Sequence, residues 1–342
     1  MTLRYGADEF LEKLDEVEEQ LTRPDYEVVH PYEATVGCVL EGGFIVKRIL
    51  GRGATAVALL VEQQNRQFVL KVARSPDSNA RIRNEFELLK SLGWPQLIEV
   101  HALHEFDDLL GISMDHAGDQ TLARQIREDG ALDLTLLRQF GEDLLRTVRY
   151  LDENGVAHRD IKPDNIGVRV GKTKKRNELC LFDFSLAGAP AENISIGTPP
   201  YLDPFLCERK VKRWNTKSEL FSVAMTLHEM ATGSLPKWGD GRAVPSLTKG
   251  EVNLVGELFP SELHARFVFF FAKALRPNYA ERFDNLEEML NEWLRIFETI
   301  DEPVRPGPRK KSSNGSPPAI RRPKRFPDIP NWMACLNRWA SI

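Results

Sequence analysis

Cysteine is scarce in this 342-residue chain, which holds only four, and no two of them form a CxxC pair. The scarcity argues against a disulfide framework and a structural zinc site, and it favours a reducing, cytoplasmic location. No stretch approaches the roughly 20 consecutive apolar residues that a membrane span needs, so no membrane association is expected. The opening residues are acidic and polar, which is not typical of a secretory signal.

Basic residues are outnumbered by acidic residues in most of the chain. Residues 301–342 hold nine Lys and Arg against three Asp and Glu, which leaves 37 basic against 47 acidic residues in the rest. The acidic body argues against direct nucleic-acid binding by the core. With 42% hydrophobic and 28% charged residues, the composition is that of a globular protein.

The periodicity of apolar residues changes along the chain. It predicts strands over 44–49, 56–61 and 67–73, a helix over 80–91, and strand-like runs over 97–101 and 109–114. Farther on it predicts a long helix over 136–154, short strands over 166–170 and 179–182, and helices from 204 to 300. A small strand-rich lobe before a larger helical lobe is an α+β arrangement, with a cleft expected between the lobes.

The two ends differ from this central part. Residues 7–22 form a predicted amphipathic helix, which either packs on the outside of the domain or binds a partner. Residues 301–330 are rich in Pro, Ser, Gly, Lys and Arg, which predicts a flexible linker and a candidate docking segment, followed by a short apolar segment. The expected organisation is a helical extension over 1–39, a domain over 40–300, and a basic tail over 301–342.

The most specific motif is the run His158-Arg159-Asp160-Ile161-Lys162-Pro163-Asp164-Asn165, on a predicted loop after the long helix. Phosphoryl transfer needs an acceptor for the substrate hydroxyl proton, a cation for the developing charge, and an oxygen ligand for metal. Asp160, Lys162 and Asn165 supply these three. The run resembles the catalytic loop of eukaryotic-like (Hanks-type) protein kinases, and Lys162 is typical of the serine/threonine form.

The resemblance covers residues 40–298 and implies a bilobal protein kinase fold. A β-rich N-lobe over residues 40–116 and a helical C-lobe over 117–300 are expected to hold ATP in the cleft between them. The expected metal is Mg²⁺, with Mn²⁺ as a substitute. The protein substrate is not identified by any motif.

The run Leu181-Phe182-Asp183-Phe184-Ser185 lies where the family carries its metal-binding DFG motif. The resemblance implies that Asp183, together with Asn165, binds the metal as a hard oxygen ligand for a hard cation. Ser185 replaces the glycine of the family. The replacement removes backbone freedom and predicts that the inward–outward flip of this segment is restricted.

The run Leu50-Gly51-Arg52-Gly53-Ala54-Thr55-Ala56-Val57 resembles the glycine-rich loop, whose backbone folds over the phosphates, and an ordinary hairpin turn is the alternative. The expected nucleotide contacts in this loop are Leu50, Gly51, Gly53 and Val57. Lys71, between apolar residues on the third strand, is expected to hold the α- and β-phosphates. Burying its charge without a partner would be costly.

The partner of Lys71 is expected to be an acid on the next helix, where the spacing of leucines favours Glu85 and leaves Glu87 as a solvated residue. The run Met114-Asp115-His116-Ala117 resembles the hinge of the family. There the backbone groups of Asp115 and Ala117 are expected to bind adenine, with Met114 as the gatekeeper.

The run Gly197-Thr198-Pro199-Pro200-Tyr201-Leu202-Asp203-Pro204 resembles the substrate-docking end of the activation segment. The resemblance implies that the Thr198 hydroxyl binds the catalytic Asp and Lys. The glutamate of the APE motif is replaced by Phe205. Its usual partner, Arg282, is therefore expected to pair with another acid such as Asp203, or to be exposed, because an unpaired buried guanidinium is expensive.

Two other positions concern support and control. Glu219 stands where the family has the aspartate that steadies the catalytic loop, and it can accept the same backbone hydrogen bonds. Ser195 is the candidate for regulatory phosphorylation, because Arg159 precedes the catalytic Asp. The alternative is that the short activation segment needs no modification.

Alternative functions are a pseudokinase-like nucleotide-binding scaffold, favoured by the departures at Ser185, Phe205 and Glu219, and a small-molecule kinase of the same fold. Against the scaffold, the motif residues expected to bind nucleotide and metal are all present. The run GTPPYLDPF also resembles kinase modules of bacterial defence systems against phage, in which such a chain can be one module of a larger protein.

Overall fold

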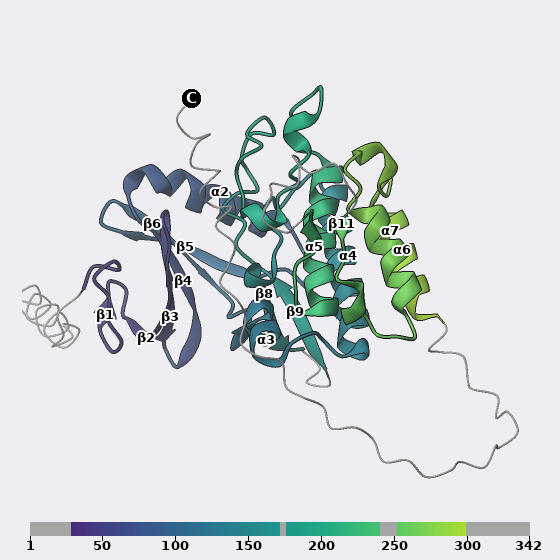
Figure 1. Cartoon of the computed structure of the whole chain (residues 1–342). Helices are drawn as coiled ribbons and strands as arrows, with labels where there is room; N and C mark the ends of the chain where they lie inside the picture. The colour runs from purple at the N-terminus through teal and green to yellow at the C-terminus, as the bar shows by residue number, and fades with distance from the viewer. Residues whose placement is uncertain (1–28, 172–175, 240–251, 299–342) are drawn as a thin grey trace, which may run out of the picture. The chain divides into compact units, whose positions relative to one another are not determined.

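The computed structural model describes residues 29–171, 176–239 and 252–298 (Figure 1). The chain forms two compact units. Of the described residues, one unit contains 29–86 together with Val100–His116, and the other contains Glu87–Glu99 and those from Ala117 onward. The amphipathic helix predicted over 7–22 and the basic tail predicted over 301–342 lie outside the described residues.

The first unit is built on a six-stranded antiparallel sheet with the order β1-β2-β3-β4-β6-β5. Its strands are β1 (Val39–Leu40), β2 (Phe44–Arg52), β3 (Ala56–Gln63), β4 (Arg66–Ala73), β5 (Val100–Phe106) and β6 (Leu109–Met114). Gln64 and Asn65 join β3 to β4 with positive φ angles of 51° and 61°. Two such residues form the tight turn that suits the twist of a hairpin.

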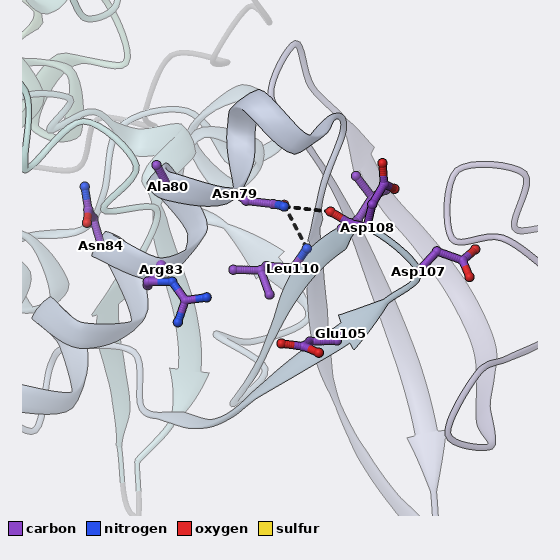
Figure 2. Close-up of a pocket in the computed structure, with 9 residues that line it drawn as sticks. Asn79, Ala80, Arg83, Asn84, Glu105, Asp107, Asp108 and Leu110 are labelled. Carbon is purple, nitrogen blue, oxygen red and sulfur yellow. Dashed lines mark hydrogen bonds between the residues drawn. The ribbon is translucent and has the colours of Figure 1, made fainter.

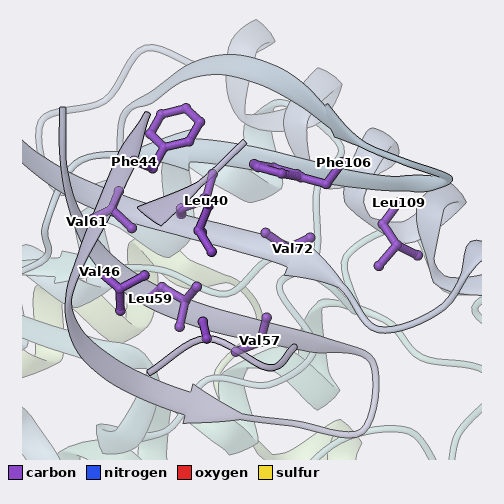
Figure 3. Packing of buried hydrophobic residues seen from close by; sticks show 11 residues of the cluster. Leu40, Phe44, Val46, Val57, Leu59, Val61, Val72, Phe106 and Leu109 are labelled. Carbon is purple, nitrogen blue, oxygen red and sulfur yellow. The ribbon is translucent and has the colours of Figure 1, made fainter. Parts of the chain in front are cut away.

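One face of this sheet carries the core of the first unit. Val57, Leu59 and Val61 alternate along β3 and are each fully buried. Alternate residues of a strand point to the same face, so these three side chains meet Phe44 and Phe106 in one cluster (Figure 3). The short apolar runs of the sequence therefore indicated these strands correctly.

The second unit is mostly helical. Its helices are α3 (Leu122–Asp129), α4 (Leu134–Glu153), α5 (Thr216–Thr232), α6 (His264–Ala274) and α7 (Leu286–Phe297). Four of these helices begin at residues whose side chains accept backbone N–H groups of the first turn, namely Thr121, Asp133, Asn215 and Asn285. Such caps satisfy donors that the helix itself leaves unpaired.

Two small sheets complete the second unit. β7 (Gln120–Thr121), β8 (Ile166–Val170) and β9 (Asn177–Leu181) form one of them, and β10 (Lys237–Trp238) pairs with β11 (Val252–Asn253) in the other. β8 and β9 carry the chain between the two segments that hold the predicted catalytic and metal-binding residues. The hairpin therefore brings Ile166 opposite Leu181.

α4 and α7 approach one another closely at a glycine. A Cβ atom built on Gly141 of α4 would lie 2.3 Å from the ring of Trp293 on α7. Trp293 is fully buried, and its indole Nε1 donates to the carbonyl of Arg138 at 3.3 Å. A side chain at position 141 would displace this ring, so the glycine allows α7 to pack closely against α4.

One predicted element was misplaced. The strand-like run predicted over 97–101 is instead a single bridge from Leu97 to Leu181, and β5 begins only at Val100. β5 carries polar residues such as His101 and Glu105, which hid its extent in the sequence. Among the described residues, no helix is both long enough and apolar enough to cross a membrane.

Candidate active site

The carboxylate of Asp160 is the centre of the candidate site in the second unit. Its Oδ2 accepts from Lys162 Nζ at 2.7 Å and from the side-chain amide of Asn165 at 2.9 Å. Its Oδ1 accepts from the Thr198 hydroxyl at 2.7 Å and from the Thr198 backbone N–H at 2.9 Å. The structure thus brings together four residues predicted from two separate motifs. An ionised carboxylate held in this way can accept a proton from a hydroxyl placed beside it.

Lys162 joins the two motifs. Its Nζ donates to the Thr198 hydroxyl as well as to Asp160, and its side chain is only 17% exposed. The hydrogen bonds fix the ammonium group beside the carboxylate. A fixed cation at this place can stabilise negative charge that develops during a reaction.

Glu219 of α5 holds the loop that carries Asp160 through hydrogen bonds to its backbone. Glu219 Oε1 accepts from the backbone N–H of His158 at 2.7 Å and of Arg159 at 3.1 Å, and Oε2 accepts from the Trp214 indole at 2.9 Å. Burial raises the pKa of Glu219, and these hydrogen bonds oppose the rise. The expected supporting contact is present, but the sequence did not indicate Trp214.

Arg159 lies under the activation segment. Its guanidinium donates to the carbonyls of Ala189 at 2.7 Å, Pro190 at 2.8 Å and Asn193 at 2.5 Å, and it stacks over the ring of Trp214 at 5.0 Å. Arg159 has a φ angle of 69°, a left-handed conformation that is uncommon outside glycine and tends to occur at functional sites.

Asp183 follows β9 and is adjacent to the catalytic loop. The N–H of Phe182 donates to the carbonyl of Asn165 at 3.0 Å, and the imidazole of His158 lies 3.0 Å from the Phe182 carbonyl. Asp183 itself has a φ angle of 65°. The next residue, Phe184, is buried with its ring centroid 4.5 Å from that of His158. These contacts fix the backbone on both sides of the Asp183 carboxylate.

The donor set fits a hard divalent cation. Asn165 uses its side-chain nitrogen for Asp160, so its side-chain oxygen is the atom that remains for a metal. Asp183 would add a carboxylate. Within the described residues no cluster of three or more His, Cys, Asp or Glu side chains has the arrangement of a metal site. Mg²⁺ is usually held by one or two carboxylates together with water and substrate phosphates, which agrees with this small set.

The first unit holds the predicted lysine–glutamate pair. Lys71 Nζ on β4 lies 2.8 Å from Oε1 and 2.6 Å from Oε2 of Glu85, whose side chain is 1% exposed. Glu87, the alternative acid, is exposed. The ion pair joins the two residues that the sequence predicted to pair, and it gives the half-buried lysine an opposite charge at hydrogen-bond distance.

Glu85 is positioned by the way its helix, α2 (Asn79–Ser91), is fixed to the β5–β6 hairpin. The Asn79 side chain donates to the carbonyl of Asp108 at 2.7 Å and accepts from the N–H of Leu110 at 2.8 Å (Figure 2). A hollow of about 510 Å³ lies beside this contact, between the start of α2 and the hairpin. No motif of the sequence indicated this role for Asn79.

The predicted nucleotide contacts of the glycine-rich loop lie in the first unit. Leu50, Gly51 and Gly53 are exposed at the end of β2, and the Gly53 N–H donates to the Ala56 carbonyl at 2.8 Å. Val57 was assigned wrongly. It points into the buried cluster, while its neighbour Ala58 lies opposite Lys71 in the strand pairing. Adjacent residues of a strand face opposite ways, so Ala58, not Val57, shares the face of Lys71.

The hinge residues lie at the division between the units. Met114 is 5% exposed and pairs with Val69 of β4. The Asp115 carboxylate lies 3.1 Å from the His101 imidazole. Ala117 is the first residue of the second unit after this division.

Arg282 pairs with another acid, Asp203, which confirms the first of the two predicted outcomes, pairing or exposure. Its guanidinium donates to both carboxylate oxygens of Asp203, at 2.7 Å and 3.1 Å, and both side chains are almost completely buried. Arg209 donates to the same carboxylate and to the Asn215 side chain. The sequence did not predict this second arginine.

Comparison with known proteins covers the region that holds these residues. Residues 44–292 match the family described as the protein kinase domain. Over 338 residues the chain is 36% identical to the probable kinase PglW of Streptomyces coelicolor, a match that covers 85% of this chain and 22% of that protein. It is 26% identical over 219 residues to the serine/threonine-protein kinase PrkC of Bacillus subtilis, covering 60% of this chain and 33% of that protein.

A third relative is the serine/threonine-protein kinase nekl-2 of Caenorhabditis elegans, 27% identical over 235 residues, with 61% of this chain and 64% of that protein covered. The matched region is thus less than two thirds of each of these relatives. The region that matches the protein kinase domain, residues 44–292, includes the Lys71–Glu85 pair, the Asp160 network and Asp183. The chain belongs to the protein kinase domain family.

Proposed function

We propose that the chain transfers the γ-phosphoryl group of ATP to serine and threonine hydroxyls of proteins, with Asp160 as the catalytic base. The observation that carries the proposal is the Asp160 carboxylate, held by Lys162, Asn165 and Thr198 at hydrogen-bond distance. The relatives named serine/threonine-protein kinases support the same activity.

In the proposed reaction the substrate hydroxyl oxygen bonds to the γ-phosphorus while the bond from that phosphorus to the bridging oxygen of ADP breaks. The hydroxyl proton passes to Asp160. Lys162, 2.7 Å from Asp160, supplies positive charge to the transferring group. Lys71, held by Glu85, binds the α- and β-phosphates as a point charge. Backbone groups of Asp115 and Ala117 bind adenine.

Family membership implies the use of ATP and a divalent metal. We infer that the metal is Mg²⁺, with Mn²⁺ able to replace it, and that Asn165 and Asp183 bind it through oxygen. When bound, it neutralises charge on the β- and γ-phosphates. The residues of the chain serve to fix the proton acceptor and the phosphates beforehand, which removes the cost of ordering them during the reaction.

The direct test is the transfer of labelled phosphate from ATP to a generic basic protein. Asp160→Ala is expected to lower the rate by at least about 100-fold, the usual contribution of a positioned general base. Asp284→Ala removes an exposed carboxylate of the same unit and is expected to retain the wild-type rate. If the wild type binds ATP but transfers no phosphate, the nucleotide-binding scaffold is the correct function instead.

The role in phage defence remains a prediction that rests on the resemblance of GTPPYLDPF. The similarity to the probable kinase PglW is compatible with it. Bacteria that carry the wild-type chain or Asp160→Ala would be compared for phage plaque formation and for their phosphoproteins. Equal plaque counts would remove the defence assignment, and the changed phosphoproteins would name the substrates. The N-terminal helix and the basic tail are the proposed docking segments for these partners.

A further inference from the structure

Residues 29–40 lie before the region that matches the kinase family, yet they are built into the first unit. The Val29 N–H donates to the Val39 carbonyl at 3.0 Å, and β1 pairs with β2. Ala34 and Leu40 are fully buried members of the core cluster, where Leu40 is visible in Figure 3. The core therefore anchors both ends of the stretch that separates Ala34 from Leu40.

This anchored segment holds the glycine-rich loop. Arg52, between Gly51 and Gly53, donates from its guanidinium to the carbonyls of Tyr32 and of Ala34, the latter at 2.7 Å. In return, the Tyr32 hydroxyl donates to the Gly53 carbonyl at 3.4 Å. These contacts tie two successive residues of the loop to the segment. We name residues 30–34 together with Arg52 the clasp.

A third side chain fixes the ring of Tyr32. The guanidinium carbon of Arg74, just after β4, lies 5.5 Å from the ring centroid, a distance at which a cation and an aromatic face attract. The hydrogen bonds from Arg52 have a charged donor, and such bonds are about twice as strong as neutral ones. The clasp is thus a set of contacts and not a single surface hydrogen bond.

The loop itself shows why such support matters. A Cβ atom built on Gly51 would meet nothing within 4 Å, and Gly51 is not among the residues with positive φ. The protein alone therefore does not require glycine there, whereas a phosphate approaching the backbone does. An exposed loop of this kind must be ordered when it binds, and that ordering weakens binding unless it is done in advance.

We infer that the clasp is a positioning device, in which Tyr32 and Arg52 preorganise the glycine-rich loop for the phosphates of a nucleoside triphosphate. The inference rests on the proposed function. Removing the clasp raises the KM for ATP and leaves kcat nearly unchanged, because the groups around Asp160 are untouched. Arg52→Ala weakens ATP binding by about tenfold, which corresponds to 1.4 kcal/mol. Arg52→Lys is expected to retain only part of the wild-type affinity for ATP, since an ammonium group lacks the planar, forked donors of a guanidinium.

The experiment measures ATP–Mg²⁺ affinity by titration calorimetry on the full chain, together with KM and kcat. Arg52→Ala, Tyr32→Ala and the double variant form a cycle, and Arg48→Ala, at an exposed position of the same strand, is the matched control. If the clasp acts as one structure, the losses of ATP affinity in the two single variants are not additive, because each variant breaks the same set of contacts. The clasp also predicts faster hydrogen exchange of residues 50–55 in both single variants.

The outcomes separate the two proposals. A wild type that does not bind ATP overturns the proposed function and the clasp together. Wild-type binding with unchanged affinity in Arg52→Ala overturns the clasp alone. Fully additive losses without faster exchange of the loop also overturn it, because Arg52 would then act by contacting the nucleotide. An equal loss in Arg48→Ala would mean that only the general positive charge matters.

Discussion

At the residue scale, a single carboxylate, that of Asp203, faces two arginines in the interior of the second unit. Arg282 takes both of its oxygens and stacks on Phe221 with its guanidinium 4.9 Å from the ring centroid. Arg209 shares one oxygen and lies 4.4 Å from the Tyr279 ring. Without Asp203, two guanidinium groups would be left buried beside one another.

Asp203→Asn is expected to lower the free energy of unfolding by about 3 kcal/mol, in the range found when one partner of a buried ion pair is removed. Urea unfolding followed by fluorescence would measure the change. Asp284→Asn is the control, because its carboxylate is 83% exposed and pairs with Lys217 at the surface. A loss below about 1 kcal/mol for Asp203→Asn, typical of a surface pair, would contradict the assignment.

The same pair shows how far the sequence can predict a site. The absence of the usual glutamate indicated that Arg282 needed another acid, and Asp203 was near enough in the motif to be named. Arg209 was not named, because its contact depends on how the chain turns between Asp203 and α5. Motif residues within one loop, such as Asp160 and Asn165, were predicted because their short separation in sequence limits their separation in space.

At the scale of elements, the activation segment is already held in place. Arg159 donates to three carbonyls of this segment, and the Trp214 N–H donates to the Ala191 carbonyl at 2.7 Å. Arg159 therefore satisfies backbone acceptors of this segment in the unmodified chain. This arrangement favours the alternative in which the segment needs no phosphate on Ser195.

Ser195→Ala is accordingly expected to keep kcat/KM within about twofold of the wild type, since surface substitutions usually have small effects. Arg159→Met, which removes the three donors, is expected to lower it by more than tenfold. Mass spectrometry of wild-type protein incubated with ATP would show whether Ser195 is modified. Phosphate on Ser195 together with inactivity of Ser195→Ala would restore phosphorylation as the control.

The misassigned nucleotide contact at Val57 has a physical origin in the geometry of the strand. The sequence predicted β2, β3, β4 and β6 because each contains a short run rich in apolar residues. It placed a nucleotide contact at Val57 instead of Ala58 because a shift of one residue in a strand exchanges its two faces. The sequence cannot distinguish the faces when both residues are small and apolar. Only the pairing of Ala58 with Lys71 decides it.

At the scale of the whole molecule, stability is expected to depend on pH through a buried histidine. His228 of α5 is fully buried, and its ring nitrogens each lie 2.8 Å from a carbonyl, of Ser234 and of Leu254. Burial lowers the pKa of His228 below its ordinary value. The folded protein therefore keeps the imidazole neutral, while the unfolded chain takes up a proton below about pH 6.5.

The unfolded state then binds more protons, so stability falls as the pH drops through 6.5, by about 1.4 kcal/mol per pH unit for one such group. Unfolding free energies between pH 5.5 and 7.5 are expected to show a shallower slope in His228→Gln than in the wild type. His264→Gln, at an exposed position, serves as the control. Equal slopes in all three proteins would contradict the role of His228.

The contact between Gly141 and Trp293 has a consequence for how this chain can be altered. Because the indole occupies the space where a methyl group would stand, neither position can change alone without damage. Alanine at 141 would push the ring out, whereas a smaller ring at 293 would leave a void. Any redesign of the contact between α4 and α7 therefore has to change positions 141 and 293 together.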